Sequence, residues 1–512
     1  MARTHPWATA GAVAAVGVSL LPLGYLLLRS AEVGGDRLLR EVLTPRVAVL
    51  AGRSLALAGV VGVLCVALGL GLALLVTRTR VPLRRTLAVL AALPLAVPSY
   101  VAAYAWVAVS EAWGGARFDG FWAAVVVLTL YTYPYVYLPV AAALTGTDPA
   151  PEEVARSLGR TPAQVFREVT LPQLRPALAS GFLLAALYVL SDFGAVSILR
   201  VDTFTRAIFT AFSSGFDRVG ALGLSNVLVL LSLALILAGA DRFRARARYG
   251  RSSTARPPGR VSLGWATGPA LAAAAGVLAL ALGVPAAALV RWAAAGASRP
   301  GALAEIAEAT GASLGVALLG ALLTTALALP LGLLVARTPT AAVLLAERAT
   351  YLAHSLPGVV IGLSLVFFGV HVAHGLYQTV WLLGLAYATL FLPLAVGAIA
   401  ASAAQAPAGV EDAARSLGAS PGAVFRRVTW PLTLPGVGAG AALVLLACLK
   451  ELPATLLLRP TGLDTLATRV WSHTAVEAYA AAAPYAALIV LLAALPTWVL
   501  VRGSGLIERS HP

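Results

Sequence analysis

Long apolar runs constrain this chain more than any other feature of its sequence. Each is about 20 residues long, the length that a helix needs to cross the roughly 30 Å hydrocarbon core of a bilayer. With 59% hydrophobic and only 12% charged residues in 512, the composition is too apolar for a water-soluble fold. Twelve runs begin near Trp7, Ser54, Thr86, Phe121, Ala177, Ala221, Gly268, Ser313, Ala349, Thr379, Val437 and Ala483. We therefore expect an all-α integral membrane protein with about 12 transmembrane helices, the first of them a retained anchor rather than a signal peptide.

The charge distribution predicts how the chain is oriented. The net charge of +15 comes almost wholly from arginine, clustered at 78–85, 151–176 and 242–251. These loops lie on one side if the amino terminus is inside, as the positive-inside rule requires, although arginines in 29–53 depart from it. This pattern indicates membrane lipid rather than nucleic acid as a partner. We expect a multi-pass membrane protein with both termini in the cytoplasm.

The chain also repeats itself. Ser157-Leu158-Gly159 matches Ser416-Leu417-Gly418, an offset of 259 residues (416 minus 157). The same offset pairs Ser54 with Ser313, Arg78 with Arg337, Pro98 with Pro357, Pro134 with Pro393, Pro172 with Pro431, Asp192 with Glu451 and Arg200 with Arg459. Prolines and ionisable residues are not expected to match by chance. We predict a parallel tandem repeat of two six-helix halves, 1–240 and 263–512, joined by an Arg-rich cytoplasmic linker at 241–262.

One charged stretch interrupts each half at the same place. In the first copy, Pro151 suits the start of a helix, Glu152 and Glu153 complement its dipole, and Gly159 is a natural left-handed stop. The residues at 161–164 then offer a cap, a first-turn proline and a capping-box partner. The pattern predicts an amphipathic helix–turn–helix on the cytoplasmic face. A pair of helices that merely lie on lipid headgroups is the alternative, but it would not need the same Gly, Pro and Phe positions twice.

The doubled element resembles the EAA-x3-G-x9-I-x-LP motif of permeases of binding-protein-dependent ABC importers of type I. Three positions depart from the motif, namely Val154, Asp412 and Trp430. The resemblance implies coupling helices at about 150–172 and 409–431 that dock on a nucleotide-binding subunit. The candidate ATPase-coupling residues are Glu153, Ala155, Gly159, Phe166 and Pro172 in the first copy, and Asp412, Ala414, Gly418, Phe425 and Pro431 in the second.

The energy source is expected on another chain. A P-loop needs a Gly-Lys-Ser/Thr to hold phosphates, whereas the single lysine, Lys450, precedes Glu451. We therefore expect no enzyme activity and no cofactor on this chain, with ATP and Mg on an ABC ATPase homodimer at the cytoplasmic face. The resemblance also implies an extracytoplasmic solute-binding protein that delivers the cargo, and a location in the bacterial cell (inner) membrane.

Two alternatives belong to other functional classes. A secondary transporter driven by an ion gradient fits the helix count but leaves the doubled cytoplasmic element unexplained. A membrane-embedded enzyme is less favoured, because the sequence has no HExxH and no His/Cys cluster at catalytic spacing.

The fifth run of each half carries the evidence about cargo. The stretches SDFGAVSILRVDTFTRAIF and LKELPATLLLRPTGLDTLATRV resemble the fused ferric-iron permeases, most sharply at KELPATLLLRP. The resemblance implies ferric iron as cargo, with thiamine, phosphonate or another small anion as alternatives within the class. Ferric ion favours carboxylate and phenolate oxygen, by extension of the hardness argument for metal ligands. Candidate pathway residues are Asp192, Lys450, Glu451 and Tyr133, although structural pairing of these charges is equally compatible with the sequence.

Other residues have simpler interpretations. Tyr131, Tyr133, Tyr135 and Tyr137 cannot share one helical face and are more typical of packing. His371 and His374 are more typical of a solvated loop than of a metal site, so a metal site stays unassigned, and the two cysteines fit small buried hydrophobes. Pro98 and Pro357 interrupt the third run of each half, and we expect them to be bending points in alternating access.

Overall fold

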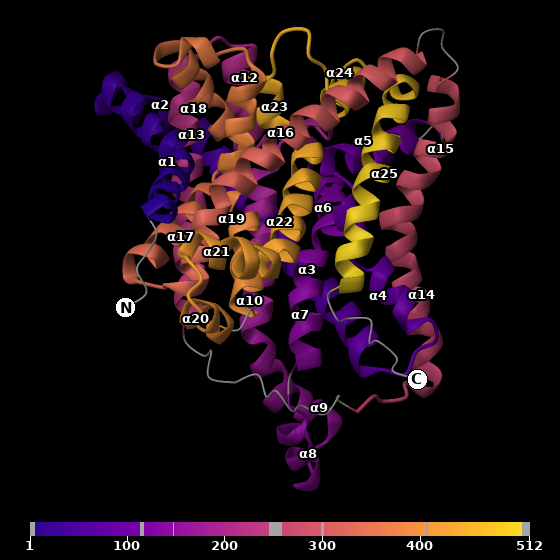
Figure 1. The fold of residues 1–512 in the computed structure, drawn as a ribbon. Coiled ribbons are helices and arrows are strands. Elements are labelled where there is room, and N and C mark those ends of the chain that lie inside the picture. Colours follow the sequence, from indigo (N-terminus) through magenta and orange to yellow (C-terminus); the bar gives the residue numbers. More distant parts are fainter. Residues whose placement is uncertain are drawn as a thin grey trace. The chain divides into compact units, whose positions relative to one another are not determined.

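The computed structural model describes residues 6–112, 117–146, 148–244, 259–297, 302–405 and 408–503. The predicted linker at 241–262 therefore lies largely outside the described residues. Within them the chain is helical (Figure 1), and the only extended pairing is an isolated β-bridge between Thr79 and Val261. Nine described helices are long and apolar enough to span a membrane, and two bent pairs and one shorter apolar helix supply the other runs. The prediction of an all-α membrane protein with about 12 spans is confirmed.

The described helices form two compact units, and neither unit coincides with one half of the sequence. Unit 1 combines Met1–Val42, Ile208–Asn226 and Pro300–Ser472, and unit 2 combines Leu43–Ala207, Val227–Arg299 and His473–Pro512. Each unit contains the central helices of one sequence half together with the first helix of the other. The exchange was not visible in the sequence, because one apolar run resembles another whatever it packs against.

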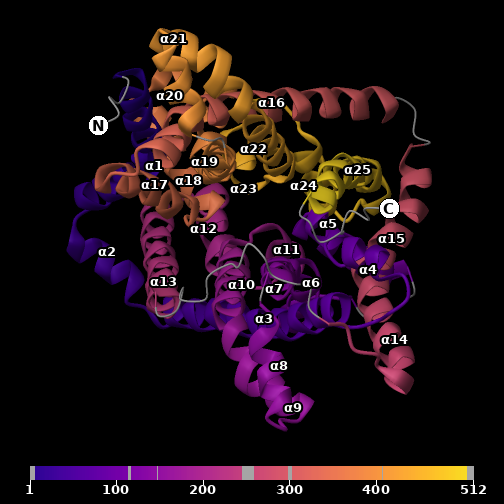
Figure 2. The same cartoon turned by 60° about the horizontal axis from the view of Figure 1, so that its bottom comes forward.

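Unit 2 is built around α3 (Pro45–Arg78), which packs against α7 and α10. Its other elements are α4 (Arg84–Leu90), η1 (Leu93–Ala96), α5 (Ser99–Ala112), α6 (Gly120–Thr132), α7 (Pro134–Gly146), α8 (Ala150–Ser157), α9 (Pro162–Val165), η2 (Phe166–Thr170), α10 (Leu171–Ser191), α11 (Gly194–Ile198), η3 (Gly264–Ala266), α14 (Thr267–Leu278), η4 (Ala279–Gly283), α15 (Val284–Ala297) and α25 (Tyr479–Gly503). From the second sequence half, α15 packs against α25 and α5, and α15 and α25 lie side by side in Figure 2.

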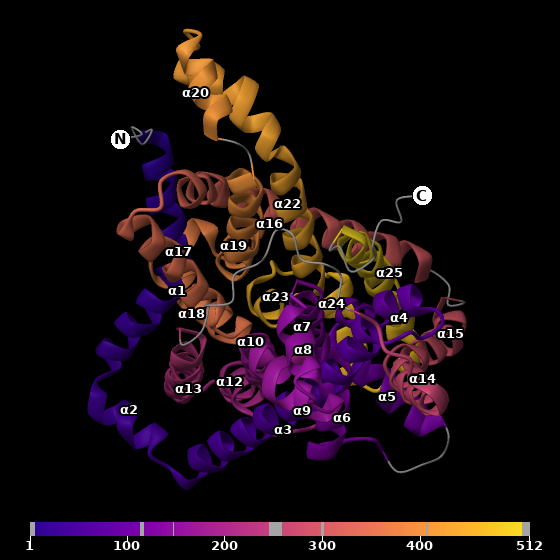
Figure 3. The ribbon, with the colours of Figure 1, turned by 90° about the horizontal axis from the view of Figure 1, so that it is seen from below.

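Unit 1 repeats this plan around α16 (Ala302–Arg337), which packs against α19, α22 and the amino-terminal α1 (Pro6–Val33). Its other elements are α2 (Gly35–Val42), α17 (Ala341–His354), α18 (Gly358–His371), η5 (His374–Leu376), α19 (Val380–Gln405), α20 (Ala408–Ser416), α21 (Pro421–Val424), η6 (Phe425–Thr429), α22 (Trp430–Lys450), α23 (Pro453–Leu458) and most of α24 (Leu466–Ala475). Figure 3 shows α1 beside α17. Three helices cross the unit boundary in sequence, namely α12 (Phe204–Ser213), α13 (Arg218–Arg244) and the end of α24.

Small residues let the central helices of unit 2 approach closely. A Cβ on Gly181 of α10 would stand 2.7 Å from the Val136 Cα of α7, and a Cβ on Gly69 of α3 would stand 2.8 Å from the Val136 Cβ. Larger side chains would push α3, α7 and α10 apart. Close backbone approach of this kind is how helices associate in a membrane, where lipid is as apolar as the side chains.

Candidate functional site

The first charged stretch folds as α8, a turn, and α9, which continues through η2 into α10. Gly159 ends α8 in the left-handed region with a φ of 79°, and Gly418 has a φ of 83° in the second copy. Thr161 and Gln164 form the expected capping box at the start of α9. The helix–turn–helix is present, but its second helix is not a separate surface element, because Pro162–Ser191 is one continuous apolar span.

A buried carboxylate fixes α8 to the rest of unit 2. Glu152 accepts hydrogen bonds from the Arg78 guanidinium at the end of α3, with Nη2 to Oε1 at 3.1 Å and Nη1 to Oε2 at 3.2 Å. The hydroxyl of Thr170 in η2 donates to Oε1 at 2.9 Å, and Arg156 reaches Oε2 at 3.5 Å. Three segments far apart in the sequence therefore meet at one acidic side chain.

The second copy has the same arrangement in unit 1. Glu411 of α20 lies 2.9 Å from Nη2 of Arg337, the last residue of α16. The Thr429 hydroxyl in η6 donates to it at 3.0 Å, and Arg415 reaches its Oε2 at 3.3 Å. The sequence analysis selected the neighbouring Glu153 and Asp412, both of which are exposed. The repeat did not distinguish the buried pair from the exposed one, since the offset of 259 relates Glu152 to Glu411 as well as Glu153 to Asp412.

Both copies contain one turn of π-helix, η2 and η6, at equivalent positions. In the first copy the Leu171 N–H donates to the Phe166 carbonyl, five residues earlier. Pro172 follows, and its ring would crowd the carbonyl four residues before it, so a widened turn relieves the clash. Pro431 follows η6 in the same way. The predicted Phe and Pro positions thus shape the turn that presents the threonine hydroxyl.

The tip of each helix–turn–helix is exposed and partly apolar. Leu158 is 76% exposed and Leu417 is 88% exposed, next to the left-handed glycines. The partly buried Phe425 ring lies 5.5 Å from the Trp7 ring of α1, a contact within unit 1. Ala155 and Ala414 are half-buried beneath the tips. Exposed leucines at equivalent places on two projecting turns favour a docking surface.

The carboxylates of the fifth runs cap short helices that follow a break. Asp192 ends α10, and its Oδ1 accepts from the Ala195 and Val196 amides at 3.0 and 3.2 Å. Glu451 ends α22 and accepts from the Ala454 and Thr455 amides, both at 2.8 Å. Carboxylates at such positions satisfy the free N–H groups of a helix start.

The same carboxylates contact the breaks at the predicted bending prolines. The helices before and after Pro98 meet at 95°, and those around Pro357 meet at 99°. Ser99, directly after the first proline, donates to the second carboxylate oxygen of Asp192. In unit 1 a Cβ on Gly358 would stand 3.0 Å from the Glu451 Oε1. The structure therefore brings predicted pathway residues and predicted bending points together within each unit.

The other two candidate pathway residues lie at helix ends. Lys450 is the last residue of α22. Tyr133 ends α6 and is buried, and its hydroxyl has no hydrogen-bond partner among the described residues. His371 points one ring nitrogen at the Phe367 carbonyl and the other at Arg29, which is not the environment of a metal ligand. In the described ranges no three His, Cys, Asp or Glu side chains gather as a metal site.

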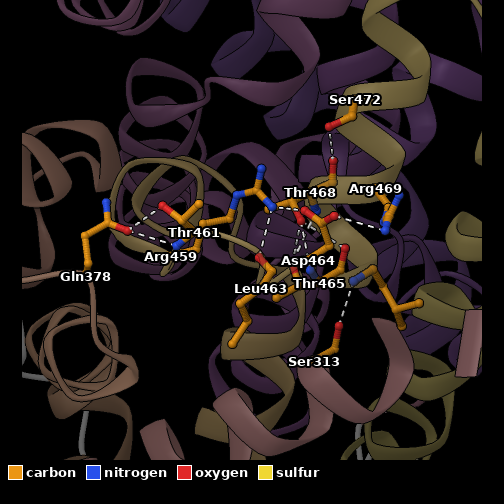
Figure 4. A network of polar contacts seen from close by, with 11 residues as sticks. Ser313, Gln378, Arg459, Thr461, Leu463, Asp464, Thr465, Thr468, Arg469 and Ser472 are labelled. Atoms are coloured by element: carbon orange, nitrogen blue, oxygen red, sulfur yellow. Dashed lines mark hydrogen bonds and ion pairs between the residues drawn. The ribbon is translucent and has the colours of Figure 1, made fainter. Parts of the chain in front are cut away.

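The loop after α23 is held by a polar network (Figure 4). Arg459 donates to the Leu463 carbonyl at 2.9 Å and pairs with Asp464, which Arg469 also contacts at 3.0 Å. Gln378 accepts from both the backbone and the hydroxyl of Thr461, each at 2.9 Å. The stretch with the sharpest resemblance thus contains the Glu451 cap and ends in a loop that Arg459 closes.

The loop is anchored alike in both halves. The Leu466 amide donates to the Ser313 hydroxyl at 2.7 Å, and the Phe204 amide donates to the Ser54 hydroxyl at 3.3 Å. Ser54 and Ser313 are partners in the repeat. The duplication therefore preserves contacts within each unit as well as residues.

Comparison with known families agrees with this doubled architecture. The sequence model of the family described as binding-protein-dependent transport system inner membrane component matches residues 66–296 and 328–504. The chain belongs to this family. It is a permease component, and the predicted tandem repeat of two permease halves is confirmed, as is its multi-pass inner-membrane character.

Some similar proteins align with nearly the whole of this chain, and others align with less than half of it. The Fe(3+)-transport system permease protein FbpB 2 of Haemophilus influenzae is 37% identical over 506 residues, which cover 98% of this permease and 99% of the relative. The sulfate transport system permease protein CysT of Salmonella typhimurium is 30% identical over 235 residues, 43% of this permease and 84% of the relative. The molybdenum transport system permease protein ModB of Mycobacterium tuberculosis is 30% identical over 248 residues, 45% of this permease and 92% of the relative.

Proposed function

We propose that this permease imports ferric iron delivered by a solute-binding protein. One observation carries the cargo assignment: 37% identity over 98% of the chain to a relative named for Fe(3+) transport. The sulfate and molybdenum permeases are 30% identical and align with less than half of the chain. Two carboxylates near helix breaks are compatible with passage of a hard cation, and a permease needs only weak contacts because a tight site would not release its cargo.

We further propose that a separate ATPase dimer binds the two exposed turns. The exposed leucines and left-handed glycines at the tips of α8 and α20 support this proposal, and so does the absence of a P-loop in the sequence. Glu153 and Asp412 lie on the exposed side of these helices and would face the partner. ATP and Mg would be held by that partner, and the amino and carboxyl termini would lie on the same, cytoplasmic side.

For the pathway we propose different roles for its candidates. Asp192 and Glu451 would hold the helix breaks open for cargo, since their oxygens are occupied by backbone amides and hydroxyls. Tyr133 offers a buried phenol oxygen and Lys450 a charge beside the second break. Pro98 and Pro357 would be the bending points during alternating access.

The test is uptake of radiolabelled ferric iron into proteoliposomes that contain this permease, its ATPase and its binding protein. Sulfate, molybdate, thiamine and a phosphonate serve as parallel cargoes. ATP-dependent accumulation of iron alone is the expected result. Accumulation of another cargo would overturn the iron assignment and keep the importer class. Uptake that ignores ATP and follows an ion gradient would overturn the class.

A further inference from the structure

Two buried clusters adjoin the proposed docking turns without belonging to their exposed surface. We define the first clamp as Arg78, Glu152 and Thr170, and the second clamp as Arg337, Glu411 and Thr429. In the first clamp the Arg78 and Glu152 side chains are only 13% and 8% exposed. In the second, Arg337 and Glu411 are 20% and 11% exposed. An ATPase bound at the exposed tips would therefore not touch these groups directly.

Each clamp joins residues from three different helical elements. In the first, Arg78 is the last residue of the long helix α3, Glu152 lies in α8, and Thr170 lies in the π turn that leads into α10. Arg78 and Thr170 are 74 and 18 residues from Glu152 in the sequence. Because α3 and α10 also pack along each other, a displacement of α8 reaches two central helices of unit 2 through one carboxylate.

The interaction is strong and directional enough to transmit such a displacement. In the first clamp Arg78 and Glu152 make two parallel contacts, and a pair of this kind fixes orientation as well as distance. In the second clamp Arg337 contacts Glu411 through Nη2 at 2.9 Å. Burial removes the screening that makes exposed ion pairs weak. The threonine hydroxyl completes the carboxylate's partners, and the same three residue types recur in both copies at the repeat offset of 259.

We propose that the two clamps are the positioning residues that carry ATPase-driven motion of the docking turns into α3 and α16. This inference rests on the proposed docking of an ATPase at those turns. It assigns the transmission to Glu152 and Glu411, and not to the exposed Glu153 and Asp412 beside them. A merely structural role would lower the amount of folded permease and leave the coupling of the remaining molecules unchanged.

The first clamp has a brace for which the second shows no counterpart in the described residues. The Val261 amide donates to the Arg78 carbonyl at 2.9 Å, and the Arg80 amide donates to the Val261 carbonyl at 3.0 Å. These bonds attach the last residues of the predicted linker to the end of α3. We therefore expect the first clamp to tolerate loss of its threonine better than the second.

The experiment follows hydrogen exchange in the complete importer, with and without a non-hydrolysable ATP analogue. The variants are Glu152→Gln with Glu411→Gln, each threonine changed to valine, and the charge-swapped pairs Arg78→Glu with Glu152→Arg and Arg337→Glu with Glu411→Arg. In the wild type, nucleotide should alter exchange in α8, α20 and the last turns of α3 and α16. In the glutamine variant we expect the response to persist in α8 and α20 and to vanish in α3 and α16, with partial recovery in the swapped pairs.

Transport supplies the second readout. Cargo moved per ATP hydrolysed should fall by about 5-fold or more in the glutamine variant, the lower range of coupling between sites. Glu32→Gln, which removes an exposed ion pair in α1, is the matched control and should leave this ratio unchanged. A retained exchange response in α3 and α16, or an unchanged ratio, would overturn the clamp inference. Failure of the wild type to bind an ATPase or to transport iron would instead count against the proposed function, and the exchange readout does not depend on the cargo.

Discussion

Among the described residues, the buried acidic side chains are Glu152, Asp192, Glu411 and Glu451, and each is tied to a turn or a helix end. Leaving a buried charge without its partner costs about 3–5 kcal/mol, so such side chains persist only where their oxygens are satisfied. Two of the four hold the docking turns and two cap broken helices. The four buried carboxylates therefore act mainly to position the backbone.

Replacing Glu451 separates a capping role from a cargo role. Glu451→Ala leaves the Ala454 and Thr455 amides without an acceptor and should destabilise the permease by about 1–2 kcal/mol, the usual cost of losing a cap. Glu451→Gln keeps an acceptor oxygen and should retain most uptake. Thermal unfolding in detergent and iron uptake are measured together, with the exposed Glu305→Ala as control. Loss of uptake in Glu451→Gln at an unchanged unfolding temperature would show that the charge acts on cargo.

The left-handed glycines of the docking turns give a second prediction at this scale. Gly159→Ala and Gly418→Ala place a Cβ at a φ of 79° or 83°, which costs roughly 1–2 kcal/mol at each position. We expect ATPase co-purification to fall by about tenfold or more in the double variant, while membrane insertion is retained. Gly71→Ala is the control, since a Cβ there would meet no atom within 4 Å. Normal co-purification and coupled transport in the double variant would contradict the docking assignment.

At the scale of elements, the paired breaks are the most distinctive feature. The third and fifth runs of each half are both interrupted, and the interruptions meet at Asp192 in unit 2 and at Glu451 in unit 1. Proline has no N–H that needs a partner, and the carboxylate accepts two backbone amides. Fewer backbone groups at each break are therefore left without a hydrogen bond. In a bilayer such an unwound backbone is tolerated only where protein or a water-filled cavity surrounds it.

Replacing both prolines tests whether the breaks serve transport. In Pro98→Ala with Pro357→Ala the missing N–H groups return, so continuous helix becomes more favourable at both sites. We expect cargo moved per ATP hydrolysed to fall, while the ATPase still co-purifies because the docking turns are untouched. Pro22→Ala, within the unbroken helix α1, is the control. Unchanged uptake in the double variant would rule out these prolines as bending points.

At the scale of the whole molecule, the exchange of helices between sequence halves matters most. Unit 1 needs α1 from the first half, which packs against α16 and α17, and unit 2 needs α14, α15 and α25 from the second. A unit cannot bury these faces with helices from one half alone. The duplication is therefore a repeat of sequence without being a division into two independently folding domains.

This exchange predicts how split permeases behave. Residues 1–244 and 259–512 expressed separately should each be degraded or aggregate, whereas co-expression should restore a membrane complex that binds the ATPase. The measurement is the yield of detergent-soluble, monodisperse protein. Full-length permease cleaved in 245–258 after folding is the control and should stay assembled. A stable, protease-resistant product from either half alone would contradict the exchanged units.

Local chemistry explains what the sequence determined by itself. The length of apolar runs predicted the spans, proline and glycine positions predicted the turns and breaks, and the offset of 259 predicted the repeat. These signals are read within about 20 residues or by direct alignment. The docking turns belong to this class, because the Gly159 stop and the Thr161 cap act on neighbouring backbone.

Only the tertiary structure decided which helices share a unit and which acid is buried in each docking helix. Glu152 and Glu153 are adjacent in the sequence, but only Glu152 pairs with Arg78, which is 74 residues away. The packing of α3 against α10 places Arg78 beside Glu152. Likewise, the sequence of α1 does not predict that α16 is its neighbour, because helices in lipid associate through close packing of their surfaces and not through hydrophobicity. Contacts that depend on shape between distant segments are settled only when the whole chain is folded.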